Sequence, residues 1–452
     1  MLKKLVYAFF TLMSLQAQAA NTDNTTGIAL TDSQALSVAH IMIDSGDLDK
    51  ATALLNDILQ SDDTNARTGA LLELGRVAAA RGDYSTAERY FLAILKYNPD
   101  ATFVRIELAK VYLLNGKYNS ADFNLRLALA DKTLPPEIQT QIKQMINFAR
   151  YKKDWNVYTG LSIVPDSNLN YATGRREECI NTMFGILCHE LDDKSTGVGI
   201  QYNIGGDYYI KLTDHFGLKT SLSFNALDFP NSTFDDYMLY MAAGPRYIFD
   251  GIGEISIQPF TQLRWYGGKY YNTVPGVRAD IDLDLAKRIH LSLGGSYSKD
   301  IYYNDNIDNI LRGNEYSTYI QPRYYINNKS FAFVGLSYTT NTAKLKSYGS
   351  NSIGYSLGYF AELPLTLTIF TKLDLIQTKY KGPQYFIMND YTLDRFTRKD
   401  IGYRAYVRLS SRYLEYKRLY PSISYTYTKR NSNAPAYEFD KHRMQIELNY
   451  RF

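Results

Sequence analysis

Two cysteines are the first residues of this chain whose type and spacing could do chemistry. The 452 residues include only Cys179 and Cys188, nine positions apart. In an exported protein this spacing predicts a disulfide that closes a short loop and contributes about 2–3 kcal/mol in the chain-entropy picture. The alternatives are two free thiols or half of a metal site, but with His189 the cysteines still lack the fourth ligand of a zinc centre. We therefore predict no metal and no cofactor.

Little else in the sequence points to catalysis. No phosphate-binding loop of the GxxxxGK[ST] type occurs, which argues against nucleotide hydrolysis. The histidines are scattered along the chain, and no pattern pairs one with a nucleophilic serine. They are His40, His189, His215, His290 and His442. We predict that the protein is not an enzyme and keep an outer-membrane hydrolase as a third class of function.

Charged residues recur at every second position in two segments and alternate there with apolar residues. The charges are Asp280, Asp282, Asp284, Arg404 and Arg408, with Arg412 as a further candidate. Successive side chains of a strand point to opposite faces. If the apolar neighbours face lipid, the charges line a water-filled lumen and set up a field that orients a charged chain. The alternatives are a solvated lining and ion pairs within the barrel.

These charges need a closed sheet to position them, and the pattern after Trp155 predicts one. Apolar residues alternate with polar ones in segments such as "LSLGGSYSKDIYY". Fourteen segments of this kind lie at 154–163, 195–210, 216–229, 235–249, 254–266, 276–289, 290–304, 315–327, 330–341, 348–361, 365–380, 396–411, 419–430 and 440–452. An even number of strands suits an antiparallel outer-membrane β-barrel. We place this transmembrane β domain at 153–452.

The connections between these segments alternate between long and short. Long ones cover 164–194, 230–234, 267–275 and 305–314, whereas "TDHF", "DGIG" and "NNKS" are short. Short turns on the periplasmic side and long loops outside are typical of outer-membrane barrels. The chain ends in "HRMQIELNYRF", whose apolar face would meet lipid. Its Tyr450 and Phe452 resemble the signal that hands such proteins to the barrel assembly machinery.

Composition supports a membrane setting and argues against nucleic acid. The chain has 41 tyrosines, whose apolar ring and polar tip suit the headgroup region. No run of about 18 apolar residues follows the first twenty positions, so any span must be a barrel. A net charge of +4 without a Lys/Arg cluster gives no reason to expect a nucleic-acid partner.

The first part of the chain predicts export and a helical domain. Residues 1–20 have the lysines, apolar stretch and small-residue cleavage pattern of a signal peptide, and 21–30 follow as a flexible linker. Between 31 and 152 the apolar pattern is helical and repeats, with "GDY" at 82–84 answered by "GKY" at 116–118. This spacing predicts a periplasmic tetratricopeptide-repeat α-solenoid, capped by "PPEIQTQIKQMINFAR".

The order of these two domains resembles that of the surface lipoprotein assembly modulators, the Slam proteins of the type XI secretion system. The join at "YKKDWNVYTGLSIVPDSNLNYAT" carries the resemblance. Its most family-like residues are Pro165, Asp166, Ser167, Asn168 and Asn170. Pro-Asp-Ser-Asn is also an ordinary turn sequence. A structural turn is therefore one interpretation of these residues, and a gating or cargo role is the other.

The resemblance implies an outer-membrane translocator that exports or displays lipoproteins or secreted haem and metal-acquisition proteins. Its repeats would dock the cargo or a periplasmic chaperone, and the barrel would conduct the cargo outward or release it laterally. The alternative is a porin-like or polysaccharide-export channel whose repeats bind a synthesis complex.

Overall fold

The computed structural model describes residues 30–411, 414 and 419–450. The expected signal peptide (1–20), residues 21–29 of the expected linker, Arg412 and Phe452 lie outside the described residues. The chain divides into two compact units, one ending at Asn124 and the other beginning at Leu125. Among the described helices, none has both the length and the apolar character needed to cross a membrane.

Consecutive helices make up the described part of the first unit, and the last of them continues into the second unit. They are α2 (Asp32–Asp44), α3 (Leu48–Ile58), α4 (Thr64–Ala80), α5 (Tyr84–Tyr97), α6 (Thr102–Leu114) and α7 (Tyr118–Leu129). Polar side chains satisfy the free N–H groups where several of them begin. Thr31 and Gln34 form a capping box on α2, and Asp83 accepts a bond from the Thr86 N–H on α5. The hydrogen bonds from Thr86 lower the pKa of Asp83.

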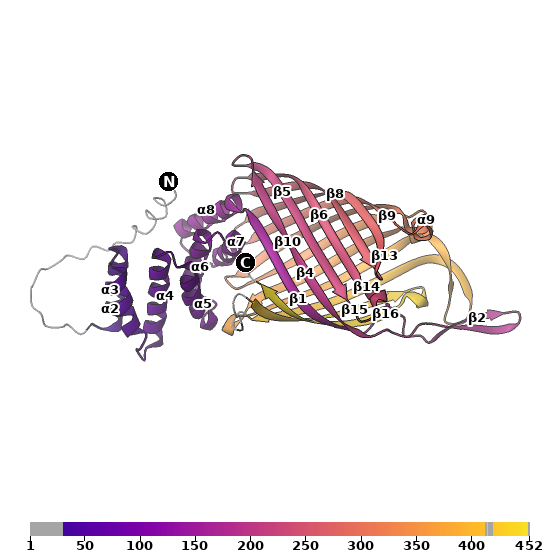
Figure 1. The fold of residues 1–452 in the computed structure, drawn as a ribbon, viewed down its shortest axis with the longest axis horizontal. Coiled ribbons are helices and arrows are strands. Elements are labelled where there is room, and N and C mark those ends of the chain that lie inside the picture. Colours follow the sequence, from indigo (N-terminus) through magenta and orange to yellow (C-terminus); the bar gives the residue numbers. More distant parts are fainter. Residues whose placement is uncertain (1–29, 412–413, 415–418, 451–452) are drawn as a thin grey trace, which may run out of the picture. The chain divides into compact units, whose positions relative to one another are not determined.

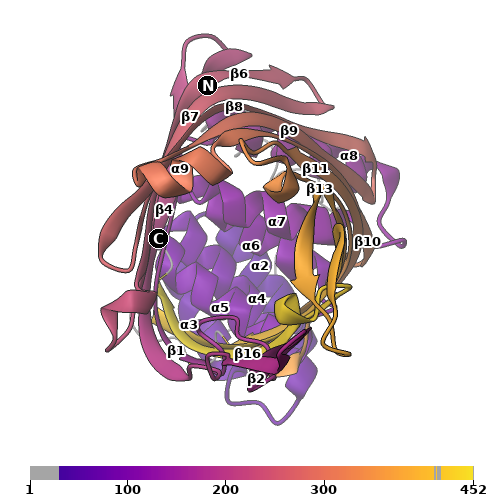
Figure 2. The same cartoon turned by 90° about the vertical axis from the view of Figure 1, so that its right-hand side faces the viewer.

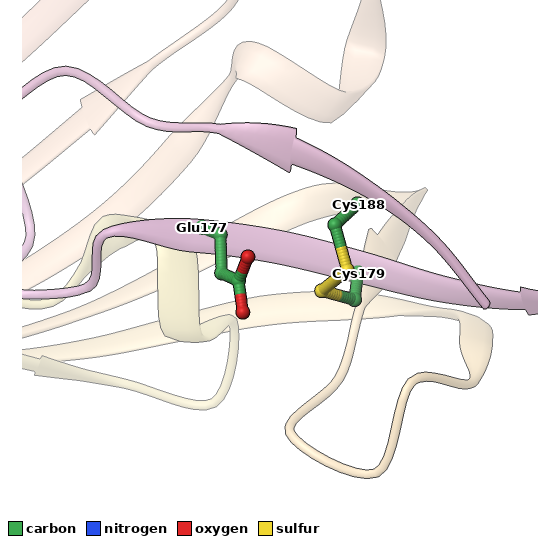
Figure 3. Close-up of side chains that lie close together, drawn as sticks. All are labelled: Glu177, Cys179 and Cys188. Carbon is green, nitrogen blue, oxygen red and sulfur yellow. A yellow bond between two sulfur atoms is a disulfide. The ribbon is translucent and has the colours of Figure 1, made fainter.

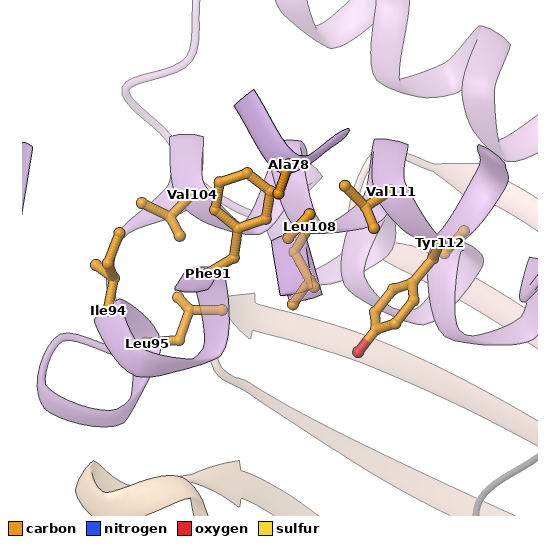
Figure 4. Packing of buried hydrophobic residues seen from close by; sticks show 10 residues of the cluster. Ala78, Phe91, Ile94, Leu95, Val104, Leu108, Val111 and Tyr112 are labelled. Carbon is orange, nitrogen blue, oxygen red and sulfur yellow. The ribbon is translucent and has the colours of Figure 1, made fainter. Parts of the chain in front are cut away.

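Small residues let neighbouring helices of this unit approach closely. At Gly75 of α4 an added Cβ would lie 2.4 Å from Cε1 of Phe91 on α5, a separation that packed atoms do not tolerate. Phe91 is fully buried in a cluster that joins α4, α5 and α6 (Figure 4). The packing of α4 on α5 therefore needs glycine at position 75. That the helices are tetratricopeptide repeats stays a prediction.

The second unit contains one more helix, α8 (Pro136–Lys152), and then a closed barrel of fourteen antiparallel strands, as predicted (Figure 1). Figure 2 shows the ring of strands from the end at which α9 (Asp305–Leu311) and β2 (Glu177–Thr182) lie. The barrel strands are β1 (Trp155–Asp166), β4 (Gly197–Lys211), β5 (Phe216–Asp228), β6 (Asp236–Phe249), β7 (Gly253–Tyr266), β8 (Lys269–Ala286), β9 (Ile289–Tyr302), β10 (Gly313–Asn327), β11 (Ser330–Asn341), β12 (Ser350–Glu362), β13 (Leu367–Ile387), β14 (Leu393–Ser411), β15 (Leu419–Ser432) and β16 (Phe439–Tyr450).

The last strand closes the barrel on the first. Leu161 of β1 pairs with Leu448 of β16, and every pair of neighbours around the ring is antiparallel. Met444, Ile446 and Leu448 are exposed on the outer surface. The polar residues between them point inward, because Glu447 lies 2.9 Å from the Arg408 guanidinium on β14. Closure leaves no free edge in the sheet, as a membrane barrel requires.

Two expectations about the connections were wrong or incomplete. Residues 267–275 were expected to form a long loop, but Gly267 and Gly268 alone make the turn, and β8 begins at Lys269. Both glycines have positive φ, 59° and 72°, which a tight turn uses and other residues avoid. The expected loop 164–194 carries a separate two-stranded sheet, β2 (Glu177–Thr182) and β3 (Gly185–Glu190).

Candidate functional site

An ion cluster ties the helix before the barrel to the inner face of the barrel wall. Arg150 near the end of α8 and Arg126 near the end of α7 both donate to the carboxylate of Asp284 on β8. The Nη2 atom of Arg126 lies 3.2 Å from Oδ2 of Asp284, and Nδ1 of His290 lies 2.9 Å from Oδ1. Two guanidinium groups thus share one carboxylate, a strong charge-assisted arrangement.

A second ion pair supports the first. Arg246 on β6 is almost fully buried, donates to the backbone carbonyl of Arg150 at 3.2 Å, and lies 2.5 Å from the carboxylate of Glu254 on β7. The same guanidinium stacks 4.6 Å above the ring of Tyr209 on β4. Because Arg246 holds the backbone of α8 while Asp284 holds its side chain, the end of α8 is fixed from two strands.

Short turns at this end of the barrel complete the contact with α8. The Asn147 side chain accepts a bond from the Gly251 N–H at 3.2 Å, and the Tyr151 hydroxyl lies 3.1 Å from Nδ1 of His215. Burial lowers the pKa of Lys153, which lies between α8 and β1. Helix α8 therefore lies against the turns and inner wall at the end where β1 begins. Helix α8 belongs to the same compact unit as the barrel, and the domain boundary expected between residues 152 and 153 stays a prediction.

The three predicted carboxylates of β8 have different partners. Asp280 forms a two-pronged pair with Arg278, at 2.6 and 2.9 Å, and accepts a bond from the Tyr319 hydroxyl at 3.0 Å. Asp282 accepts a bond from the Ser292 hydroxyl at 2.6 Å. Asp284, described above, binds the helices. The inner face thus has ion pairs within the barrel, the alternative considered for these charges, and only Asp284 reaches α8.

The two predicted arginines of β14 also differ. Arg408 donates to Glu447 and to Asn449 at 2.9 Å, so it is part of the polar network beside the closing strand. Arg404 is exposed and has no ion-pair partner among the described residues. Asp374, its neighbour across the sheet, is already 2.9 Å from Lys372. Arg404 thus leaves an uncompensated positive charge on the inner face.

The family-like motif at residues 165–170 binds strand β1 to strand β16 at the outer end of their pairing. Asp166 lies 2.9 Å from the ammonium of Lys441 on β16, and both side chains are buried. Asn168 is fully buried, and its amide donates to the backbone carbonyls of Ala172 and Asp440 at 2.9 and 3.0 Å. The motif therefore joins β1 to β16 beyond the last strand pair.

The remaining motif residues bind the loop around this junction. The Ser167 hydroxyl accepts a bond from the His442 N–H at 2.8 Å. Asn170 donates to the carbonyl of Asp193 at 2.9 Å and accepts a bond from the Ser195 N–H at 3.0 Å. Pro165 pairs with Val198 of β4. These contacts fit the structural interpretation of the motif, and a gating or cargo role stays a prediction.

Cys179 and Cys188 form a disulfide between β2 and β3 (Figure 3). The side chain of Glu177 lies near the two sulfur atoms, and these three groups are close enough together to suggest a metal site. Both sulfur atoms are used in the disulfide, so neither is available as a thiolate ligand. The two cysteines therefore cross-link the strands of a hairpin and are not ligands of a metal centre.

Tyr450, predicted to act in barrel assembly, is the last residue of the closing strand. It pairs with Thr159 of β1 and with Leu419 of β15, at the end of the barrel where α8 lies. Its place at the seam is compatible with an assembly signal, which stays a prediction. Phe452, the other half of that signal, is outside the described residues.

Sequence reasoning missed the residues that complete these contacts. Arg126, Arg150 and Arg246 were not singled out, and neither was Lys441. Arg126 and Arg150 lie far along the chain from Asp284, and Lys441 lies far from Asp166. Arg246 is eight residues from its carboxylate partner, Glu254. The one available signal was the alternation of β16, which puts Lys441 on the same face as Glu447.

The sequence of this chain is similar to those of one family of known proteins. The family model described as surface lipoprotein assembly modifier matches residues 155–452. The surface lipoprotein assembly modifier of Pasteurella multocida (strain Pm70) is 24% identical over 392 residues, which cover 83% of this chain and 75% of that protein. Surface lipoprotein assembly modifier 1 of Neisseria meningitidis serogroup B is 21% identical, covering 85% of this chain and 76% of that protein.

Among solved structures, the outer membrane channel DcaP of Acinetobacter baumannii overlaps 66% of this chain and 97% of its own, at 10% identity and a TM-score of 0.36. This similarity is too low to carry an argument about function. The family match and the closed barrel place the protein in the cell outer membrane, with its N-terminal helices in the periplasm. The chain belongs to the surface lipoprotein assembly modifier family.

Proposed function

We propose that this protein is an outer-membrane translocator that displays lipoproteins on the cell surface and conducts them through its barrel. The printed names of its relatives support lipoproteins as the cargo. Secreted haem and metal-acquisition proteins are a second class of cargo implied by the sequence resemblance. The proposal assigns no catalytic step to the chain.

The observation that carries the proposal is the attachment of α8 to the inner wall of the barrel. Arg150 and Arg126 hold Asp284, and Arg246 holds the backbone of α8. A passive porin gains nothing from a helix held against its wall at the periplasmic end. A translocator needs such a helix, because the barrel must stay closed until a cargo arrives. The attachment therefore favours a regulated path for polypeptide over an open pore.

In this proposal each part of the chain has one task. The periplasmic helices dock the lipoprotein, alone or with a chaperone, and α8 leaves Asp284 when cargo engages. The inner face then offers paired charges together with the unpaired Arg404, which would guide an extended chain. The barrel assembly machinery is a partner only while the protein is being inserted.

The test compares the outer surface of cells with and without this gene. Intact cells are treated with protease, and the released peptides and the medium are analysed by mass spectrometry. We expect one or a few lipoproteins to disappear from the surface and to accumulate in the periplasm. Secreted cargo would disappear from the medium. An unchanged set of surface and released proteins would overturn the proposal and would leave solute or polysaccharide transport as the function.

A further inference from the structure

The loop between β1 and β4 carries a disulfide-linked hairpin that is not part of the barrel sheet. Strands β2 and β3 pair with each other only, and the disulfide joins Cys179 to Cys188, which face each other directly. A two-stranded hairpin is marginally stable in water. The disulfide keeps this one folded. Since β1 begins at the periplasmic end and runs across the membrane, the hairpin lies on the outer side of the cell.

One edge of this hairpin is already occupied. The backbone N–H of Asn181 on β2 donates to the carbonyl of Tyr391 in the loop between β13 and β14, at 2.8 Å. This contact holds the hairpin against a barrel loop through β2. Strand β3 is therefore the strand whose outer edge can accept a further partner.

The backbone groups on the outer edge of β3 are free among the described residues. The Cα atoms of Cys179 and Cys188 are 4.0 Å apart, a spacing typical of a pair that exchanges no backbone hydrogen bonds. The next pair of that kind is Asn181 and Ile186. Ile186 and Cys188 consequently direct their N–H and C=O groups away from β2. No hydrogen bond to these groups occurs in the described part of the chain.

The side chains beside this edge are apolar and exposed. Met183 and Phe184 at the tip are 89% and 92% exposed, and Ile186 and Leu187 on β3 are 59% and 67% exposed. An unpaired strand edge with exposed apolar side chains is the surface that binds another extended chain by strand addition. A barrel loop that only needed to be soluble would not carry it.

Charge decides which kind of partner fits. Residues 175–194 include three basic side chains, Arg175, Arg176 and Lys194, and against them five carboxylates, so their net charge is 3 − 5 = −2. The carboxylates are Glu177, Glu178, Glu190, Asp192 and Asp193. An anionic hairpin is repelled by the phosphate groups of the outer leaflet, so a lipid surface is the poorer partner. A polypeptide segment with apolar residues and flanking Lys or Arg is complementary to it.

We propose that the outer edge of β3 binds an extended segment of the exported lipoprotein as an added strand while that protein emerges at the cell surface. The segment has apolar residues at alternate positions and Lys or Arg beside them. This inference rests on the proposed function, and it adds the part of the cargo that is recognised and the place where it is bound.

The substitution Ile186→Pro tests the edge without opening the hairpin. Proline removes the outward N–H of Ile186, and its ring obstructs an incoming strand. Because Ile186 exchanges no hydrogen bond with β2, the pairing inside the hairpin remains. The matched control Ile186→Val keeps the N–H and the branched side chain. All variants are made in the full-length protein, and barrel assembly is checked by heat-modifiable migration on gels.

Surface display of the lipoproteins that depend on this gene is measured by protease treatment of intact cells. We expect Ile186→Pro to lower it about five- to tenfold and Ile186→Val to leave it unchanged, since one backbone bond and the approach of the strand are lost. Normal display by Ile186→Pro would overturn the inference. If deleting the gene changes no surface protein, the proposed function itself fails, and this inference fails with it.

Two further outcomes would assign the edge to another partner and overturn the inference. Chemical crosslinks between two copies that Ile186→Pro abolishes, with display intact, would identify a second copy of this chain. Loss of display in the double variant Met183→Asp and Phe184→Asp, with normal display in Ile186→Pro, would indicate contact of the tip with lipid.

Hydrogen exchange gives a direct reading of the edge. The full-length protein in lipid nanodiscs is mixed with the purified lipoprotein that the deletion strain loses from its surface. We expect slower exchange at the amides of Ile186 and Cys188, which face outward. The amides of Leu187 and His189 face β2 and should change little. Equal exchange at Ile186 and Cys188 with and without the lipoprotein would exclude strand addition.

Discussion

Arg150 and Asp284 lie 134 residues apart in the chain, yet the guanidinium of one donates to the carboxylate of the other. Arg150 belongs to α8, and Asp284 lies on the inner face of β8 close to its periplasmic end. Both side chains are largely buried, so the pair is shielded from solvent. A helix outside the sheet is thereby attached to the wall of the barrel.

The variant Asp284→Asn should release α8. It leaves Arg150 and Arg126 facing a neutral amide, and breaking a buried ion pair typically costs about 3–5 kcal/mol. We expect trypsin to cleave the purified full-length protein within α8 at least about tenfold faster, because the helix detaches more often. The band pattern on gels and the mass of the fragments measure this.

The neighbouring carboxylate provides the control for that experiment. Asp282 lies two residues away on the same face, but it bonds Ser292 and His290 and does not reach α8. Asp282→Asn should therefore leave the rate of cleavage in α8 near that of the wild type. Equal cleavage in both variants would show that Asp284 does not hold the helix.

The buried pair at the far end of the seam should control the stability of barrel closure. Asp166→Asn keeps the side-chain oxygen that accepts the Asn168 N–H but removes the charge opposite Lys441. The ammonium is then buried without a counter-ion, at a cost of about 3–5 kcal/mol. We expect the folded form to unfold at a clearly lower temperature in a heat-modifiability gel.

An exposed pair nearby provides the comparison. Lys194 and Asp440 are 2.8 Å apart, but their side chains are 31% and 44% exposed. Surface ion pairs contribute at most about 1 kcal/mol of stability. Asp440→Asn should therefore change the unfolding temperature of the barrel little. A shift as large as that of Asp166→Asn would mean that burial does not explain the role of the motif.

The barrel could be predicted from the sequence because its signal is repeated in every strand. Apolar and polar residues alternate along each strand, because one face meets lipid and the other faces the lumen. This pattern predicted the number of strands and most of their ends. The turn at Gly267 and Gly268 was missed, because the sequence analysis expected a long connection over 267–275. The structure continues β8 through Pro275, opposite Thr261 of β7.

The contacts of the candidate site could not be predicted in the same way. The sequence placed Asp284 on the inner face, but nothing in it showed that two helical arginines would reach that carboxylate. Such pairs depend on the packing of α8 against the barrel, which one sequence without relatives does not encode in any local pattern. The Asp166 motif was found only through a family resemblance, and its partner Lys441 was not found.

Arg404 offers a test of the guiding role of the inner face. It is exposed toward the lumen and has no ion-pair partner among the described residues. If an extended cargo passes this point, the charge-reversing variant Arg404→Glu should lower surface display severalfold while the barrel assembles normally. Arg404→Lys keeps the charge and should behave like the wild type. Display that is equal in the two variants would exclude a guiding role for this charge.

Gly75→Ala should weaken the helical unit. The added methyl group would meet the ring of Phe91 at 2.4 Å, and Phe91 is fully buried, so the ring has little room to move. Overpacking of this kind costs about 1–3 kcal/mol, partly offset by the better helix propensity of alanine. We expect the helical transition of the full-length protein, followed by circular dichroism, to move down by about 5 °C or more.

Gly69 on the same helix is the matched control. There the added methyl group would meet the Leu36 side chain at 2.7 Å, and a leucine can rotate away more easily than a buried ring. Gly69→Ala should therefore change the helical transition less than Gly75→Ala. A larger loss at Gly69 would show that the approach of α4 to α2, and not that of α4 to α5, limits the packing of this unit.

Removal of the disulfide should loosen the outer hairpin and leave the barrel intact. The paired variant Cys179→Ser and Cys188→Ser loses about 2–3 kcal/mol of hairpin stability in the chain-entropy picture, which is enough to melt a two-stranded sheet. We expect protease added to intact cells to cut within 177–190 in this variant and to spare the wild type. The heat-modifiable migration of the barrel should stay unchanged, because β2 and β3 pair with no barrel strand. If the barrel instead unfolded at a lower temperature, the hairpin would be shown to support the pairing of β1 with β16 through the loop that contains Asn168 and Asn170.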